Sequence, residues 1–371
     1  KTPHPFLLPH EFFSAMYADL PSKWLSLIGG GGTYAFWKEL RDSDFVRNHP
    51  NLLESTWHKT IPLGMHGDGG AFSKQDSLFV ISWNSLLSDG STIAKRFIFT
   101  VIRKSDMVEN TLDEIWKVFA WSMNTLQEGL TPGLDLRGRD AGQRDALAGG
   151  WRGTLCQVRG DWEFYTQVFH FPQWNCGESM CYMCKASATN EEYLWTEVDD
   201  DAGWRRTRWT HEAYMLYLAA RSLRIPLLLV LVIGLRLDCV MVDLLHTVDQ
   251  GLASSVIGNV LWELVTRKVF GGATNDANVV GLDEDLAAYY KRTQVPFGSS
   301  RLQGKLTADR LRSHGFHKLK AKAAATRHLA VYALELWIRF SLKTDRDNMI
   351  LAILMLLVEF YKIVDEEGMF F

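Results

Sequence analysis

The sequence predicts an α/β protein with a mixed β-sheet, in which three strands form an antiparallel meander and a fourth lies parallel to the first. A mainly helical C-terminal half is expected to follow. Two observations support this fold class: β-rich apolar segments are joined by short links before residue 104, and the later apolar segments have helical spacing. Of the 371 residues, 47% are hydrophobic and 22% charged, which excludes a disordered or fibrous chain.

Four strands are predicted from apolar, β-rich segments. The first runs from Ile61 to His66 and ends at Gly67-Asp68-Gly69-Gly70, and the second and third are expected at 77–83 and 96–103. Because short links join these three, they can form an antiparallel meander. The fourth, 155–158, ends at Arg159-Gly160-Asp161, and because it follows a helix it can lie parallel beside the first.

Helices are predicted from apolar residues at helical spacing. The first is expected at 111–127, where Thr111 and Glu114 fit a capping box. A surface loop rich in Gly, Arg and Asp is expected at 131–153. Further helices are expected at 212–224, 249–268, 283–292, 307–313, 319–341 and 347–364.

Two apolar runs, 225–235 and 349–358, are eleven and ten residues long. A membrane-spanning helix needs about 20 apolar residues, so we expect each run to be a buried strand or a core helix, and no membrane partner. The start at Lys1, without a visible signal peptide, and the end at Phe371 after an apolar helix suggest a fragment or a processed piece.

Four parts of the chain are expected. They are an N-terminal scaffold segment (1–57), the sheet core with a cysteine cluster at its end (58–190), a mainly helical segment (191–300), and basic then apolar helices (301–371).

Aspartates follow the first and the fourth predicted strands. Because ligands of such sheets lie beyond the carboxyl ends of the strands, we expect Asp68 and Asp161 to face each other at one edge. Two carboxylates there can hold Mg²⁺ or Mn²⁺, and two such ions about 4 Å apart promote phosphodiester chemistry. The glycines around Asp68 would let a phosphate approach the backbone. The plain alternative is a turn, because Asp-Gly is a common turn dipeptide.

Three of the five cysteines lie in the segment 176–184. The pair Cys181-x-x-Cys184 fits one edge of a tetrahedral Zn²⁺ site, to which Cys176 or His170 could add ligands. Buried thiols without a metal are the alternative.

A second motif is Asp243-x-x-His246. Residues three apart on a helix share a face, which permits an aspartate-oriented imidazole or a shared metal. A capping aspartate with an incidental histidine is the alternative.

Charge is uneven along the chain, although the net charge of −3 indicates no partner. Between Lys291 and His328 ten Lys or Arg stand against one acid, whereas residues 191–201 hold six acids. Clustered cations suit a phosphate backbone, and a solvated helix face is the alternative. The expected DNA contacts are Arg301, Lys305, Arg310, Arg312, Lys318, Lys320, Lys322 and Arg327.

These motifs, in this order, resemble eukaryotic DDE cut-and-paste transposases of the CACTA and Mutator-like group. The amino-acid sequences of the motifs are similar to transposase-derived reading frames of some protist genomes, and the resemblance covers roughly residues 57–330. The segments that carry it are Ile61-Pro-Leu-Gly-Met-His-Gly-Asp-Gly, Asp243-Leu-Leu-His-Thr-Val-Asp-Gln-Gly251 and Gly258-Asn-Val-Leu-Trp-Glu-Leu264.

The resemblance implies an RNase H-like catalytic core that is interrupted by a helical insertion (191–300) and completed by the helices of 301–371. It also implies DNA as the partner, Mg²⁺ or Mn²⁺ as the cofactor, a nuclear location and a possible homo-oligomer. Asp68 and Asp161 would match the first two catalytic acids, and Asp243 and His246 the motif of the insertion. The family expects the third acid near position 325, where this chain has Ala325.

Glu335, ten residues beyond Ala325, is the remaining candidate for the third acid. The chain is therefore expected to be a transposase-like enzyme that cleaves and joins DNA strands by two-metal chemistry, or a decayed, catalytically inactive copy that still binds nucleic acid. A membrane-associated protein is the third alternative.

Overall fold

The computed structural model divides the chain into two compact units, Lys1–Met241 and Val242–Phe371, each with its own hydrophobic core. It describes residues 3–73, 75–88, 92–173, 175–295, 300–313 and 315–367. This division differs from the sequence-based boundaries at 57, 190 and 300. The N-terminal helices pack into the core of the sheet, whereas the C-terminal helices pack with those of the expected insertion.

The N-terminal scaffold consists of short helices that pack beside the sheet. Phe13 and Trp37 are fully buried in the core of the first unit, and the indole of Trp37 donates a 2.7 Å hydrogen bond to the carbonyl of Thr60. This bond ties the scaffold to the start of the first strand. The helices are α1 (Pro9–Asp19), α2 (Trp24–Ile28), α3 (Thr33–Glu39) and α4 (Asp44–Asn48), with 3₁₀ turns at Gly30–Gly32 and Glu54–Lys59.

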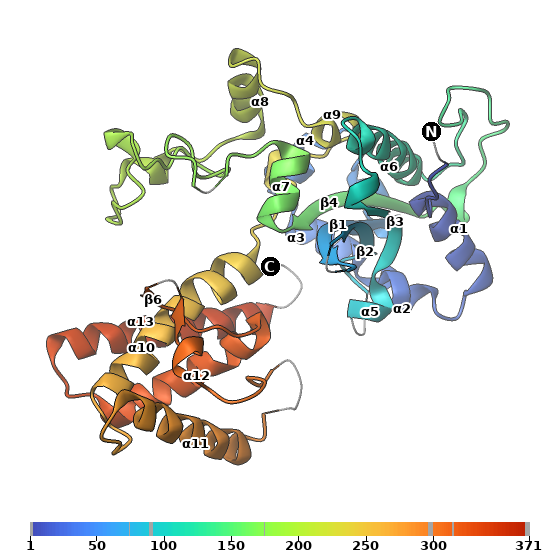
Figure 1. Cartoon of the computed structure of the whole chain (residues 1–371). Helices are drawn as coiled ribbons and strands as arrows, with labels where there is room; N and C mark the ends of the chain where they lie inside the picture. The colour runs from blue at the N-terminus through green and yellow to red at the C-terminus, as the bar shows by residue number, and fades with distance from the viewer. Residues whose placement is uncertain are drawn as a thin grey trace. The chain divides into compact units, whose positions relative to one another are not determined.

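The sheet of the first unit has the strand order β3-β2-β1-β4 (Figure 1). The strands β1 (Thr60–Ala71), β2 (Ser77–Ser85) and β3 (Phe97–Arg103) pair antiparallel, and β4 (Arg152–Gly160) pairs parallel to β1. A single parallel bridge joins Val158 of β4 to Val240. The predicted meander with a fourth, parallel strand is therefore confirmed.

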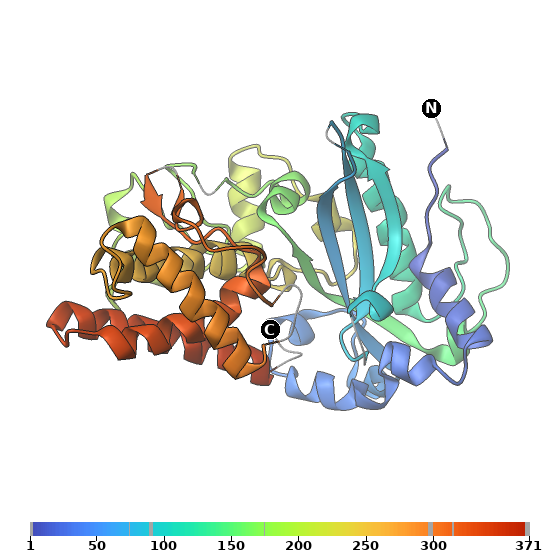
Figure 2. The same ribbon diagram turned by 60° about the horizontal axis from the view of Figure 1, so that its bottom comes forward.

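Alternation along β1 separates a core face from an opposite face. Ile61, Leu63 and Met65 are fully buried, whereas Asp68, on the other side of the pleat, is exposed. Helix α6 (Thr111–Glu128) packs against the sheet (Figure 2) and buries Ile115, Trp116, Phe119, Met123 and Leu126.

The capping box predicted for α6 is absent from the described residues. The N-cap is Asn110, without a side-chain cap. The Thr111 hydroxyl instead accepts a 2.8 Å hydrogen bond from the backbone N–H of Val108, which lies before the helix. The prediction of a capping Thr111 was therefore wrong, because that hydroxyl closes the preceding turn.

The remainder of the first unit is mostly irregular. The expected loop at 131–153 folds back on itself through the bridges Leu130–Ala146 and Leu134–Asp140 before β4 begins. The apolar run 225–235 forms α9 (Leu227–Leu231), whose Leu228 is fully buried in the core. The other helices are α5 (Thr92–Lys95), α7 (Trp162–Phe169) and α8 (His211–Ala220).

The second unit is helical. A π-helical segment, Leu245–Ala253, continues into α10 (Ser254–Thr266), and α11 (Asn275–Thr293), α12 (Ala323–Phe340) and α13 (Asp345–Glu367) follow. In place of the helix expected at 307–313, the chain forms a 3₁₀ turn and a hairpin of β5 (Arg312–Ser313) and β6 (Phe316–His317). None of the helices among the described residues is long and apolar enough to cross a membrane.

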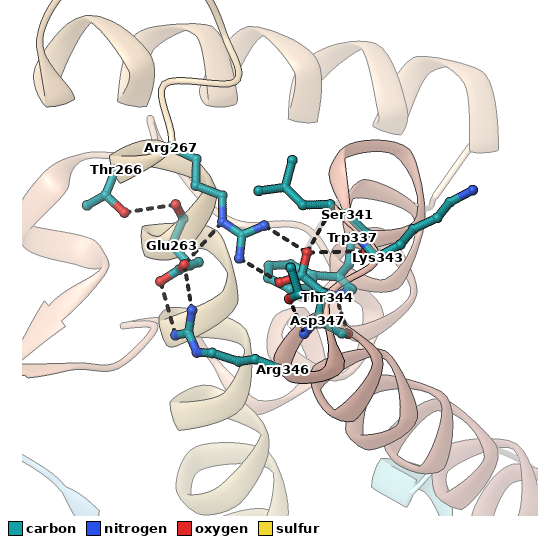
Figure 3. Close-up of polar contacts among 10 residues, drawn as sticks. Glu263, Thr266, Arg267, Trp337, Ser341, Lys343, Thr344, Arg346 and Asp347 are labelled. Carbon is teal, nitrogen blue, oxygen red and sulfur yellow. Dashed lines mark hydrogen bonds and ion pairs between the residues drawn. The ribbon is translucent and has the colours of Figure 1, made fainter.

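A buried ion pair joins α10 to the start of α13 (Figure 3). Both carboxylate oxygens of Asp347 accept hydrogen bonds from the guanidinium of Arg267, at 2.8 and 3.0 Å. The Arg267 guanidinium also lies 4.8 Å above the ring of Trp337, whose indole donates to the Asp347 carbonyl. Three helices thus meet at Asp347, whose side chain is 1% exposed.

Candidate functional site

The parallel pair β1–β4 brings the two predicted catalytic acids to the same end of the sheet. The last paired residues are Gly67 and Gly160, and Asp68 and Asp161 each follow directly. Neighbouring strands lie about 4.8 Å apart, so Gly67 and Gly160, the residues directly before the two aspartates, lie about one strand spacing apart. Carboxylate oxygens are the ligands that Mg²⁺ prefers, and this pair has the chemistry to hold one.

The two aspartates have different local roles. Asp161 is the N-cap of α7, and its Oδ1 accepts a 2.7 Å hydrogen bond from the backbone N–H of Phe164. A capping aspartate stabilises a helix without any metal, so α7 alone gives a structural reason for the carboxylate. Asp68 is exposed on β1, opposite Val80 of β2.

Phe164 explains the glycines that precede both acids. Its side chain is 1% exposed, and a Cβ added to Gly67 or Gly160 would lie only 1.8 or 2.3 Å from its ring. These two glycines therefore make room for an aromatic ring on the core face, whereas the sequence suggested that the glycines near Asp68 admit a phosphate. Gly70, by contrast, has no atom of the described residues within 4 Å of its added Cβ.

Gly67→Ala is expected to destabilise the first unit by about 1–3 kcal/mol, because the new methyl group overpacks the site of the Phe164 ring. Urea or thermal unfolding of the full chain measures this effect. The matched control is Gly70→Ala, which meets open space and should change the free energy of unfolding by less than about 0.5 kcal/mol. Equal stability of the two variants would contradict the packing role of Gly67.

Two basic residues that sequence reasoning missed share the face of Asp68. His66 and Arg159 are paired in register one step inside the carboxylates. Arg159 hydrogen-bonds the amide oxygen of Asn84, farther back along the sheet, and its Nε is buried without a partner among the described residues. Burial, with smaller effects of nearby Arg96 and Arg159, lowers the pKa of His66 to about 4, so His66 is neutral at pH 7.

The Asp243-x-x-His246 motif forms a side-chain pair at the start of the second unit. Asp243 Oδ2 lies 2.6 Å from His246 Nδ1, and Asp243 Oδ1 accepts a 3.1 Å hydrogen bond from the backbone N–H of His246. The aspartate thus caps the helical segment and orients the imidazole at once. Asp243 is 11% exposed and His246 51%, so the imidazole faces solvent.

The third acid lies on α12 of the second unit. Glu335, the remaining candidate, forms a 2.5 Å ion pair with Arg292 of α11. Ala325, where the resemblance expects a carboxylate, is 1% exposed in the first turn of α12. Among the described residues of α12 Glu335 is the one carboxylate, and its Arg292 partner competes with any metal for its charge.

The cysteine cluster forms a dithiol pair. The neighbouring Cys184 thiol lowers the pKa of the Cys181 thiol below its ordinary value, and the backbone N–H of Met183 donates a 3.3 Å hydrogen bond to Cys181 Sγ. Cys176 is exposed, and His170 is the C-cap of α7, where burial lowers its pKa. Among the described residues no three His, Cys, Asp or Glu side chains gather as a metal site. The four-ligand zinc site stays a prediction.

The predicted DNA contacts lie in the second unit but differ in their surroundings. Arg327 is 33% exposed and bonds the buried Asp249, and Arg301 lies over the ring of Tyr290. Arg312 covers Trp262, which also stacks on His317, and the neighbouring Phe316 is 77% exposed. Exposed aromatic and cationic side chains on one hairpin are typical of nucleic-acid-binding surfaces. Residues 296–299 and 314 of the basic stretch 291–328 lie outside the described residues.

No protein-family model matches the chain, and no curated protein is similar to it in sequence.

Proposed function

We propose that the chain is a transposase-like, DNA-binding protein whose first unit is an RNase H-like core. One observation carries the proposal: β1 and β4 are parallel neighbours, and an aspartate follows the last paired residue on each strand, Asp68 after Gly67 and Asp161 after Gly160. The antiparallel meander that β1 forms with β2 and β3 agrees with this interpretation. The basic hairpin of the second unit supplies a surface suited to phosphates.

In this proposal Asp68 and Asp161 would hold the divalent ions at the sheet edge. Bound Mg²⁺ or Mn²⁺ would supply Lewis-acid stabilisation of the attacking and leaving oxygens in phosphodiester cleavage. The contribution of the chain itself is positional. The β1–β4 register sets the spacing of the carboxylates, and the cap on α7 fixes the direction of Asp161.

The test is nicking of supercoiled plasmid DNA by the purified chain. We expect relaxed circles with Mg²⁺ or Mn²⁺ and none with EDTA, because the carboxylates act only through a divalent ion. If the wild-type chain cuts nothing with either ion, the enzymatic part of the proposal is wrong.

The second candidate is a nucleic-acid-binding remnant that has lost its chemistry. It is favoured by Ala325, which replaces the expected carboxylate, and by the ion pair that engages Glu335. This candidate predicts DNA binding without cleavage. A plot of the logarithm of the DNA affinity against the logarithm of the salt concentration should then be linear, with a slope of about −0.9 for each phosphate contacted. A salt-independent affinity would exclude both candidates.

A further inference from the structure

The second unit contains a cavity of about 410 Å³ whose wall is strongly cationic. Four segments line it: the π-helical segment, residues 301–303, the residues on either side of the β5–β6 hairpin, and the start of α12. Its polar lining consists of Gln250, Arg301, Gln303, Arg310, Lys320 and Lys322. Four of these six side chains are cations, and the described residues that line the cavity include no acid.

The backbone holds these cations together. The N–H of Lys320 donates a 2.7 Å hydrogen bond to the carbonyl of Arg310, so the two residues lie opposite each other across the hairpin. Among the residues that the structure describes, Arg310, Lys320 and Lys322 form no ion pair with an acid of the chain. Like charges held close together repel, and a bound anion removes that cost.

The first turn of α12 adds to the positive field. Lys322 is its N-cap and provides no side-chain acceptor, and the first turn of this 18-residue helix holds no acid. Helix N-termini present unpaired N–H groups and a partial positive charge to anions. Ala325, which lines the cavity, also keeps the wall free of negative charge.

We infer that this cavity is a binding site for a phosphate group. The phosphate belongs either to the DNA backbone or to a free polyphosphate such as a nucleotide. The first source rests on the proposed function, and the second does not. The position where the resemblance expects a metal-binding carboxylate thus lines a site for an anion.

The test is titration of the full chain with pyrophosphate by calorimetry, alongside binding of a duplex oligonucleotide. The double variant Lys320→Gln/Lys322→Gln removes two cations of the wall and should weaken pyrophosphate binding at least tenfold. Ala325→Glu places a carboxylate in the wall and should weaken it similarly. The control Lys268→Gln/Lys343→Gln removes two exposed lysines outside the basic stretch of the same unit and should leave the affinity within twofold.

The two phosphate sources give different results. If the phosphate is that of DNA, the cavity variants lose duplex affinity and the salt slope becomes shallower by about two. If it is that of a free polyphosphate, they lose pyrophosphate affinity and bind duplex as the wild type does. No pyrophosphate binding together with unchanged duplex binding in folded cavity variants would overturn the inference. Absence of plasmid nicking, which tests the proposed function, would leave it standing.

Discussion

Asp68→Asn is expected to reduce Mg²⁺-dependent nicking on the order of 10³-fold while leaving DNA affinity nearly unchanged. Lewis-acid stabilisation by a bound metal supplies several kcal/mol, and each 1.36 kcal/mol corresponds to a tenfold change in rate. Asparagine keeps the size of the side chain and removes its charge, so the variant loses metal affinity without a new cavity. Initial rates of plasmid relaxation, with duplex affinity measured in Ca²⁺, separate the two effects.

Asp161→Asn should give the same loss of nicking. Asparagine caps helices as well as aspartate does, so α7 should remain in place and a loss of activity would report on the metal. Asp161→Ala, by contrast, should also cost about 1 kcal/mol of stability through the lost cap.

The control for both acids is Asp106→Asn, which changes an exposed aspartate of the same unit. Wild-type nicking rates in both Asp68→Asn and Asp161→Asn would show that the sheet edge is not the catalytic site.

The sheet could be predicted from the sequence because its signals are local. Alternation in β1 places Ile61, Leu63 and Met65 on one face, and the short links after β1 and β2 leave only antiparallel pairing. The helical segment before β4 permits a parallel return beside β1. The two acids at one edge follow from that topology.

The surroundings of the acids could not be predicted in this way. The packing of the Phe164 ring against Gly67 is a contact between residues that are 97 positions apart in the sequence. A Gly-Asp dipeptide looks the same in the sequence whether the glycine makes room for a ligand or for an aromatic ring. Likewise, Arg159 and His66 become neighbours only through the β1–β4 register, which a bulge after Leu63 shifts by one residue.

The two-unit division has the same origin. Residues 301–371 were expected to complete the core of the sheet, because their apolar spacing shows a buried face but not the partner of that face. In the structure Leu329, Leu336 and Leu354 pack in a cluster with helices α10 and α11. Helical periodicity in the sequence indicates that one face of a helix is buried. Which element buries that face is seen only in the tertiary contacts.

Asp347→Ala is expected to unfold the second unit at a markedly lower temperature, with a fall in its Tm of about 5 °C or more. The variant leaves two nitrogens of the Arg267 guanidinium, 16% exposed and stacked over Trp337, without the acceptors that Asp347 supplied, while the Arg267 Nε keeps its 3.1 Å bond to Glu263. It also removes the acceptor for the backbone N–H of Leu342, at 2.6 Å, where α12 ends and α13 is about to begin. Both losses leave polar groups unpaired in a buried place.

Acid should weaken the same contact in the wild-type chain. The hydrogen bonds from Arg267 hold the pKa of the Asp347 carboxyl well below its ordinary value. A carboxyl whose pKa is lowered by folding contributes stability above its unfolded pKa, about 3.9, and loses it as the pH falls toward the folded pKa. The Tm of the second unit should therefore decrease when the pH is lowered below about 4. In Asp347→Asn the Tm should depend less on pH over that range.

Two variants separate the ion pair from nonspecific damage. Asp345→Asn changes an exposed aspartate in the first turn of α13 and should leave the Tm nearly unchanged. Arg267→Met/Asp347→Leu replaces both charges by apolar side chains, which often costs little where a single removal costs much. We expect it to recover part of the lost Tm, but not all, because the N–H of Leu342 still lacks its acceptor. If the double variant unfolds earlier than Asp347→Ala, the loss of Asp347 acceptors for the Arg267 guanidinium is not the source of the instability.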